Sequence, residues 1–344
     1  MVNQPDPKTA TAQPQSTSST RPQENDNGWQ GVVDNPWRRL RQFTAARIGL
    51  GRSGVSLPTR ELLAFQLAHA QARDAVHTPL DFDQLSQQLE ALADEYPLLN
   101  QQPPVRLHSE AIDRPTYLQR PDLGRSLDQA SRVLLKQEQA AAADTAASNA
   151  TDTAETAFDL AIVIADGLSA TAIASNAAAF IGQLCQQLQT NQQLQTDQRD
   201  WSLAPITLVE QGRVAIGDDV GELLNARMVL MLIGERPGLS SPDSLGLYLT
   251  FAPQTGLTDA RRNCISNVRP QGLNYSEAAS KALYLMQEAQ RLQLSGVDLK
   301  DRSGNASLEN DNTALENDNT SLENDISVLE NNNHTIHNQN FLLR

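Results

Sequence analysis

One apolar run that stops abruptly constrains this sequence most: 228-MVLMLI-233 leads directly into 234-GERPG-238. A strand that is apolar on both faces is typical of a parallel sheet covered by helices on both sides. The carboxyl ends of such strands are where open α/β sheets bind ligands. The Gly-Glu-Arg-Pro-Gly segment therefore predicts a ligand-binding loop at the edge of a sheet.

Other runs alternate between strand and helix character. Residues 160–188 have the pattern of a strand, an Asp-Gly loop and a helix, and residues 205–238 add a second strand, a short helix and the run above. With a further strand candidate over 245–253, the alternation predicts an α/β fold, a Rossmann-like doubly wound parallel sheet over residues 158–299. Its last helix is expected to start at Ser276 as cap and to end at Gly296.

Composition divides the rest of the chain into four segments. The N-terminal segment is too poor in large apolar residues to fold, and the next has helical periodicity, with Thr59 as a candidate cap. An Ala-rich stretch of low complexity then precedes the sheet region, and a repetitive tail follows it. The expected segments are a disordered N-terminus at 1–28, a helical N-terminal region at 29–137, an insertion or linker at 138–157 and a heptad-repeat tail at 303–344.

The tail repeats an apolar residue every seven positions, at Leu308, Leu315, Leu322, Leu329, Ile336 and Leu343. This is the spacing of a coiled-coil seam, but the second seam position is mostly Asn and the flanking positions are acidic. Two such helices would repel each other, so the pattern favours half of a heterodimeric zipper with a basic partner. A fused segment and a frayed or disordered extension remain the alternatives.

The totals exclude several classes of protein. A formal charge of -14 argues against a nucleic-acid or anionic membrane surface, and two cysteines cannot build a disulfide framework or a four-thiolate zinc site. The sequence shows no secretory signal and no apolar run of the ~18 residues that a membrane span needs, so a soluble cytoplasmic protein is expected. Neither G-x-G-x-x-G nor G-x-x-x-x-G-K-[ST] follows a strand, which argues against a dinucleotide or nucleotide phosphate cradle.

Four motifs carry a resemblance to a known family: 117-YLQRPDLGRSL-127, 162-IVIADGLSATAI-173, 230-LMLIGERPGLSSPDSLG-246 and 261-RRNCISNV-268. In this order and at these spacings they resemble the small subunit of ethanolamine ammonia-lyase. The resemblance covers roughly Asn35 to Leu299. The D-x-H-x-x-G motif of proteins that replace the cobalamin base by a histidine is absent, which agrees with this family.

The resemblance implies a non-autonomous subunit of an adenosylcobalamin-dependent ammonia-lyase, which deaminates ethanolamine to acetaldehyde and ammonia by radical chemistry. It implies a large catalytic subunit as partner, with the cobalamin enclosed between the two, and a cytoplasmic location with a bacterial microcompartment as alternative. The cofactor-binding residues that it implies are Val214, Glu235 and Cys264; it implies no catalytic and no metal-binding residue in this chain.

Each of these residues also has a structural explanation. Gly-Glu-Arg-Pro-Gly alone is typical of an ordinary turn, Val214 of a core residue and Cys264 of an inert thiol. A scaffold module that assembles a partner protein without a catalytic role is therefore the alternative function. An independent dehydrogenase ranks last, because its phosphate cradle is missing.

Overall fold

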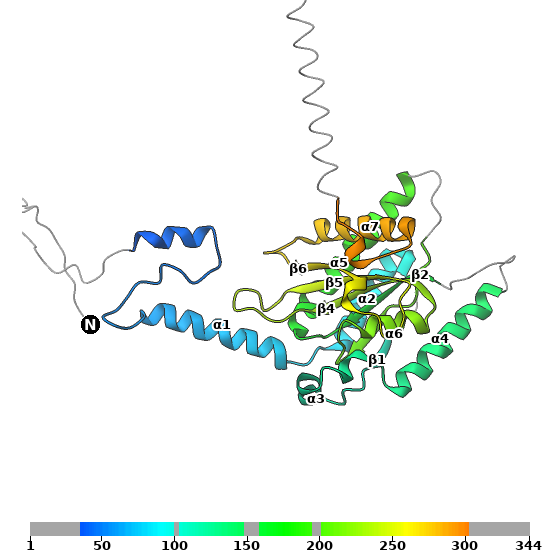
Figure 1. The fold of residues 1–344 in the computed structure, drawn as a ribbon, viewed down its shortest axis with the longest axis horizontal. Coiled ribbons are helices and arrows are strands. Elements are labelled where there is room, and N and C mark those ends of the chain that lie inside the picture. Colours follow the sequence, from blue (N-terminus) through cyan, green and yellow to red (C-terminus); the bar gives the residue numbers. More distant parts are fainter. Residues whose placement is uncertain (1–34, 100–102, 148–157, 195–200, 303–344) are drawn as a thin grey trace, which may run out of the picture. The chain divides into compact units, whose positions relative to one another are not determined.

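A computed structural model describes residues 35–99, 103–147, 158–194 and 201–302 (Figure 1). The chain divides after Glu61 into two units, and the second unit contains the sheet. Its elements follow one another as α1 (Thr59–His77, which begins in the first unit), α2 (Phe82–Glu95), β1 (Val105–His108), α3 (Arg114–Gln119), α4 (Gln129–Ala147), β2 (Phe158–Ala165), α5 (Ala170–Leu194), β3 (Thr207–Glu210), α6 (Ile216–Leu223), β4 (Ala226–Gly234), β5 (Leu245–Phe251), β6 (Arg262–Val268) and α7 (Tyr275–Leu292), with short 3-10 turns between them.

The sheet has six strands in the order β1-β3-β2-β4-β5-β6. The first four are parallel, whereas β5 runs antiparallel to β4, and β6 runs antiparallel to β5. The α/β class is confirmed, but the prediction of an all-parallel, Rossmann-like sheet is wrong for β5 and β6. Residues 235–244 contain no crossover helix, and a parallel connection needs one, so the chain returns antiparallel.

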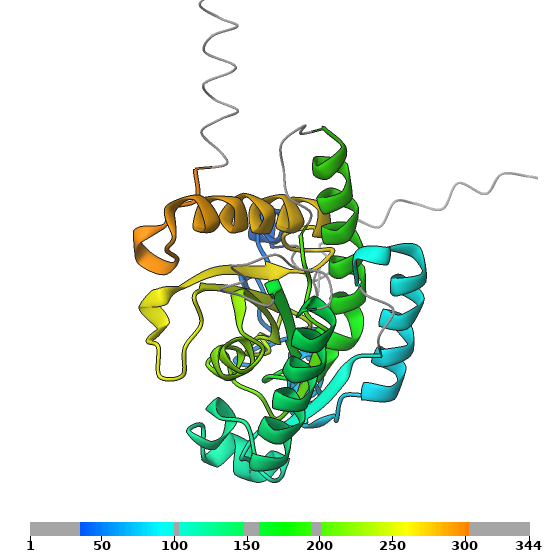
Figure 2. The same cartoon turned by 90° about the vertical axis from the view of Figure 1, so that its right-hand side faces the viewer.

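Helices cover both faces of the sheet, as the two-sided burial of β2 and β4 predicts. On one face Leu160, Ile162 and Ile164 pack with residues of α2, α5 and α7. On the other, Ala161 and Val163 pack with residues of α4 and α6. Figure 2 shows α7 and α6 on opposite sides of the strands. No helix in the described part of the chain is long and apolar enough to cross a membrane.

Two helix caps differ from their predictions. Thr59 is the first helical residue of α1 rather than a residue before it. Helix α7 is capped by Asn274, whose side chain accepts a hydrogen bond from the Glu277 backbone N–H at 2.9 Å, so Ser276 lies inside the first turn. Its C-terminal end is at Leu292, before Gln293 in the left-handed region, and Gly296 belongs to the following 3-10 turn. The sequence does contain Asn three residues before Glu, a pattern typical of helix starts.

Two of the segments predicted from composition also differ in part from the structure. The stretch predicted as helical contains strand β1, which is short and gains its stability by pairing with β3. Helix α4 continues over 138–147 of the Ala-rich stretch, because Ala has the highest helix propensity. Residues 148–157, the predicted disordered N-terminus 1–28 and the predicted zipper at 303–344 lie outside the described residues, and those predictions stay predictions.

One glycine at the carboxyl edge of the sheet tests this packing. Gly167 has φ +58, and a Cβ there would lie 2.4 Å from the Gly234 carbonyl oxygen. We expect Gly167→Ala to lower the free energy of unfolding by about 3 kcal/mol, since left-handed backbone strain of about 1–2 kcal/mol adds to the steric clash. Urea unfolding of the purified chain measures this loss.

The matched control is Gly256→Ala, where φ is +92 and no heavy atom lies within 4 Å of the added Cβ. This variant should lose only the free energy that the backbone strain costs. An equal loss in both variants would contradict the close approach of the β2 and β4 loops.

Candidate functional site

The candidate site lies where the parallel strands end. The loops after β2, β3 and β4 share this edge with the start of β5, because β5 runs in the opposite direction. Open α/β sheets bind ligands outside the carboxyl ends of their strands. The mixed sheet therefore adds an antiparallel strand to the edge where a ligand is expected.

Glu235 is the first residue after β4, and its position is fixed by three contacts. Its backbone N–H donates to the Ser244 carbonyl at 3.0 Å. Its carboxylate oxygen Oε2 accepts from the Ser244 hydroxyl and from the Asn267 backbone N–H at 3.2 Å. Within the described chain both donors contact Oε2, so Oε1 can accept a hydrogen bond from a ligand. The side chain is half-buried, which suits that role.

Cys264 lies on β6 opposite Tyr248 of β5. The residue is exposed, and its side chain lies beside that of Tyr248. Burial raises the pKa of the Cys264 thiol; the Tyr248 hydrogen bond acts in the opposite direction, and the nearby Glu235 carboxylate raises the pKa further. The thiol is therefore neutral at physiological pH and is a poor nucleophile.

Gly246 is buried beneath these side chains, which lie close to it. A Cβ at this position would lie 3.1 Å from Glu235 Oε1 and 3.2 Å from Tyr248 Cε2. We call the surface formed by Glu235, Gly246, Tyr248 and Cys264 the β5 ledge. Sequence reasoning missed Gly246 and Tyr248, although the alternation in 245-LGLYLTF-251 places both opposite the buried leucines.

Val214 lies in the loop between β3 and α6 and is half-buried. It packs against the same core cluster as Tyr248, which includes Met231 and Ile233. The structure thus brings Glu235 and Cys264 together on the β5 ledge. Val214 is not part of the ledge. Among the described residues, it and Tyr248 pack against the same core cluster.

A buried ion pair connects helix α6, which follows Val214, to strand β6, which carries Cys264. Arg262 of β6 donates to Asp218 of α6, and their side chains are only 3% and 2% exposed. Burial raises the pKa of Asp218, and the Arg262 guanidinium opposes this shift. Arg262 precedes Cys264 by two residues on the same face of β6, and Asp218 lies one turn after Val214. The pair therefore fixes the Val214 loop relative to the strand that carries Cys264.

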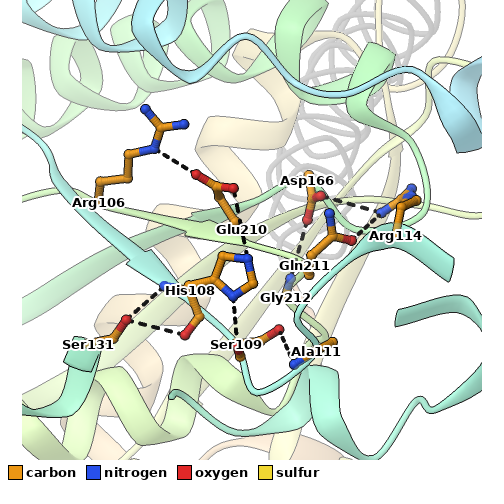
Figure 3. A network of polar contacts seen from close by, with 10 residues as sticks. All are labelled: Arg106, His108, Ser109, Ala111, Arg114, Ser131, Asp166, Glu210, Gln211 and Gly212. Atoms are coloured by element: carbon orange, nitrogen blue, oxygen red, sulfur yellow. Dashed lines mark hydrogen bonds and ion pairs between the residues drawn. The ribbon is translucent and has the colours of Figure 1, made fainter. Parts of the chain in front are cut away.

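A second polar network holds the loops after β2 and β3 (Figure 3). Arg114 donates to the Gly167 carbonyl at 2.8 Å and contacts Asp166 at 3.4 Å. The Gly212 backbone N–H donates to Asp166 at 3.3 Å. Burial raises the pKa of Asp166 to about 6, although the Arg114 charge opposes this shift. Asp166 thus joins the two loops from a buried position.

Tyr117 stabilises the loop after β3, which contains Gly212. Its hydroxyl donates to the Gly212 carbonyl at 3.1 Å. The guanidinium carbons of Arg114 and Arg213 lie 4.7 and 4.3 Å from the centre of its ring. Arg213 directly precedes Val214, so these contacts fix the backbone that carries Val214. Cation–π contacts of this kind contribute about 1–2 kcal/mol when desolvated.

His108 is the histidine of this second network. His108 Nδ1 contacts the carbonyl of the adjacent Ser109 at 2.7 Å rather than a hydroxyl (Figure 3). The Ser131 hydroxyl accepts a hydrogen bond from the His108 backbone at 2.8 Å. No cluster of His, Cys, Asp and Glu in the described ranges could hold a metal ion.

The buried ion pair generates one prediction. Arg262→Met removes the partner of Asp218 and leaves a buried carboxylate uncompensated, so we expect a loss of about 3–5 kcal/mol in the free energy of unfolding. Urea denaturation measures it. Arg291→Met is the matched control, because Arg291 pairs with Glu288 at the surface with a side chain 65% exposed. A loss as small as in this control, below about 1 kcal/mol, would contradict the role assigned to the pair.

Asp166 generates a pH prediction. Its native pKa of about 6 exceeds the unfolded value of about 4, so the native state holds an extra proton between these pH values. Its stabilising contribution is present below about pH 4 and is lost as the pH rises through 6. We expect the wild-type free energy of unfolding to fall, relative to Asp166→Asn, by on the order of 2–3 kcal/mol across this window.

Urea unfolding at half-unit pH steps measures the difference. The control is Asp94→Asn on the exposed side of α2, which should keep the wild-type pH profile. Parallel profiles for wild type and Asp166→Asn would contradict the buried, protonated state.

Comparison with known proteins matches residues 34–300 to the family described as ethanolamine ammonia-lyase light chain (EutC). A small subunit of ethanolamine ammonia-lyase from Pseudomonas fluorescens is 54% identical over 278 residues, covering 80% of this chain and 91% of the relative. The small subunit from Ralstonia nicotianae is 54% identical over 286 residues, covering 83% and 96%. That from Pseudomonas paraeruginosa is 55% identical over 279 residues, covering 81% and 92%. The chain belongs to the ethanolamine ammonia-lyase light chain family, as the resemblance of its four motifs predicted.

Proposed function

We propose that this chain binds adenosylcobalamin at its interface with the large catalytic subunit of ethanolamine ammonia-lyase, for the radical deamination of ethanolamine to acetaldehyde and ammonia. The family membership supports a small subunit with a large partner. The observation that carries the cofactor proposal is the β5 ledge at the ligand-binding edge of the sheet. The location proposed is the cytoplasm, with a bacterial microcompartment as alternative.

Glu235 would hold the rim of the cofactor. The edge of a corrin ring carries neutral amide arms whose NH2 groups are hydrogen-bond donors, and a carboxylate accepts strong hydrogen bonds. Because Ser244 and Asn267 already orient the group through Oε2, Oε1 is fixed for such a donor. A fixed acceptor loses less entropy on binding than a free side chain.

The rest of the ledge fits a broad, flat ligand. Gly246 lets the Glu235 and Tyr248 side chains lie close together, because a Cβ there would press against both. Tyr248 and the neutral thiol of Cys264 offer half-apolar contact without a second charge. Val214 offers an apolar surface from the loop before α6. These residues would bind and orient the corrin and exclude water from one side.

When bound, adenosylcobalamin supplies the radical chemistry of the reaction. This chain supplies none of its own, since the described residues hold neither an activated hydroxyl nor a metal cluster. Its residues position the cofactor and shield it from solvent, which a reactive intermediate requires. The substrate and the catalytic groups then belong to the large subunit, and this chain alone should be inactive.

The test uses the complete complex of this chain with the large subunit, loaded with adenosylcobalamin and passed through gel filtration. Glu235→Ala removes a charged acceptor, so we expect cobalamin to be retained roughly 10-fold to 100-fold less tightly, as measured by the visible spectrum of the complex. Subunit assembly should be unchanged.

Two further variants make the test specific. Glu235→Gln keeps an acceptor oxygen and should lose less retention than Glu235→Ala. Glu90→Ala, on the exposed side of α2, should behave as wild type. If Glu235→Ala retains cobalamin as tightly as Glu90→Ala, the assignment fails, and unaltered assembly would then favour the scaffold alternative.

A further inference from the structure

The first unit of the chain has a composition unlike the rest. We call residues 35–61 the N-terminal arm. It carries six arginines, at 38, 39, 41, 47, 52 and 60, and one acidic residue, Glu61, in a chain whose formal net charge is -14. Charge of one sign concentrated in a short segment is typical of a binding surface rather than of a core.

The arm also exposes large apolar side chains. None of its side chains is buried in the described structure. Trp37 is 66% exposed and Phe43 is 83% exposed. The other exposed large apolar residues of the arm are Leu40, Ile48, Val55 and Leu57. So many exposed large apolar side chains in one short segment are typical of an interaction site.

Local polar contacts give the arm a defined conformation without a core. Arg41 pairs with Glu61 at 3.0 Å. Gly49, with φ +61, approaches the Trp37 carbonyl so closely that a Cβ would lie 2.9 Å away. Ser53 and Ser56 exchange backbone hydrogen bonds at 2.8 and 3.1 Å. Ordering each residue costs about 1–2 kcal/mol of backbone entropy, and the arm, which has no fully buried residue, offsets little of it. A contact outside the arm would supply the burial that it lacks.

The match to the light chain family starts at residue 34, so the arm lies inside the family stretch rather than in an added extension. The relatives are named small subunits, which implies a large subunit as partner. We infer that the N-terminal arm docks into an apolar groove of the large subunit whose rim carries carboxylates. This inference rests on the assembly proposed above, and it names the surface that makes the contact.

Both parts of the arm have a role in this contact. Trp37, Phe43 and Val55 would fill the groove, since buried aromatic anchors carry most of the binding energy of an interface. The arginines would pair with the rim, where planar guanidinium groups match carboxylates with two hydrogen bonds. Rim charges mainly set association rate and salt dependence. Assembly should therefore weaken with salt and fail without the apolar anchors.

The test measures the affinity of the full chain for the large subunit from the same organism. Arg39→Glu with Arg52→Glu should raise the Kd at least about 10-fold at low salt and remove most of its salt dependence. Phe43→Ser with Val55→Ser should raise the Kd by a similar factor at all salt concentrations. The matched control is Arg120→Glu with Arg291→Glu, two arginines with side chains 60% and 65% exposed outside the arm.

Unfolding should not account for a raised Kd, because no substituted side chain is buried. The unfolding curves of all variants should coincide with that of wild type. Arm variants that bind like the control overturn the inference. It is also overturned if the arm variants leave the Kd unchanged but abolish self-association in sedimentation, or abolish co-sedimentation with phosphatidylglycerol vesicles. A wild-type chain that fails to bind the large subunit contradicts the proposed function itself. If wild type assembles and retains cobalamin while the arm variants assemble equally well, only the arm is wrong.

Discussion

The buried ion pair between Asp218 and Arg262 is the constraint on which the candidate site depends. It joins α6, which follows the third strand of the parallel part, to β6 at the antiparallel edge. Two desolvated charges are costly unless they are paired with good geometry, so the pair permits one arrangement of these elements and penalises others. Val214 and Cys264 lie close in sequence to the two partners. Their common face of the sheet is thus a consequence of one interaction that contributes nothing to ligand binding directly.

The reversal of chain direction after β4 gives the site its shape. In a fully parallel sheet a helix would follow β4 and cover the edge next to it. Here residues 235–244 return as a loop, and β5 places Gly246 and Tyr248 beside Glu235. The loop also supplies Ser244, which orients the Glu235 carboxylate. The ledge therefore arises from the departure from parallel topology, while the stiffness beneath it comes from the parallel strands.

The sequence predicted those strands whose burial on both faces gives them an apolar composition. Strands β2, β3 and β4 are apolar on both faces, and their runs identify them directly. Strand β6 lies at an edge and buries only every third residue, and β1 is held by pairing, so neither has a distinctive run. Glu235 and Cys264 were predicted as cofactor-binding residues through the family resemblance, and the structure places them near each other. Tyr248 and the ion pair were missed, because contacts between residues distant in sequence leave no local pattern.

The chemistry of the ledge indicates why such a chain would accompany a larger partner. It has one carboxylate, Glu235, already oriented by two donors, and one thiol, Cys264, whose pKa is raised, mainly by partial desolvation. A fixed surface with a single oriented carboxylate can hold a large ligand with many weak contacts without reacting with it. For radical chemistry that property matters, because a nucleophile or a mobile proton beside the cofactor would divert the intermediate. Inertness is therefore a functional feature of this surface.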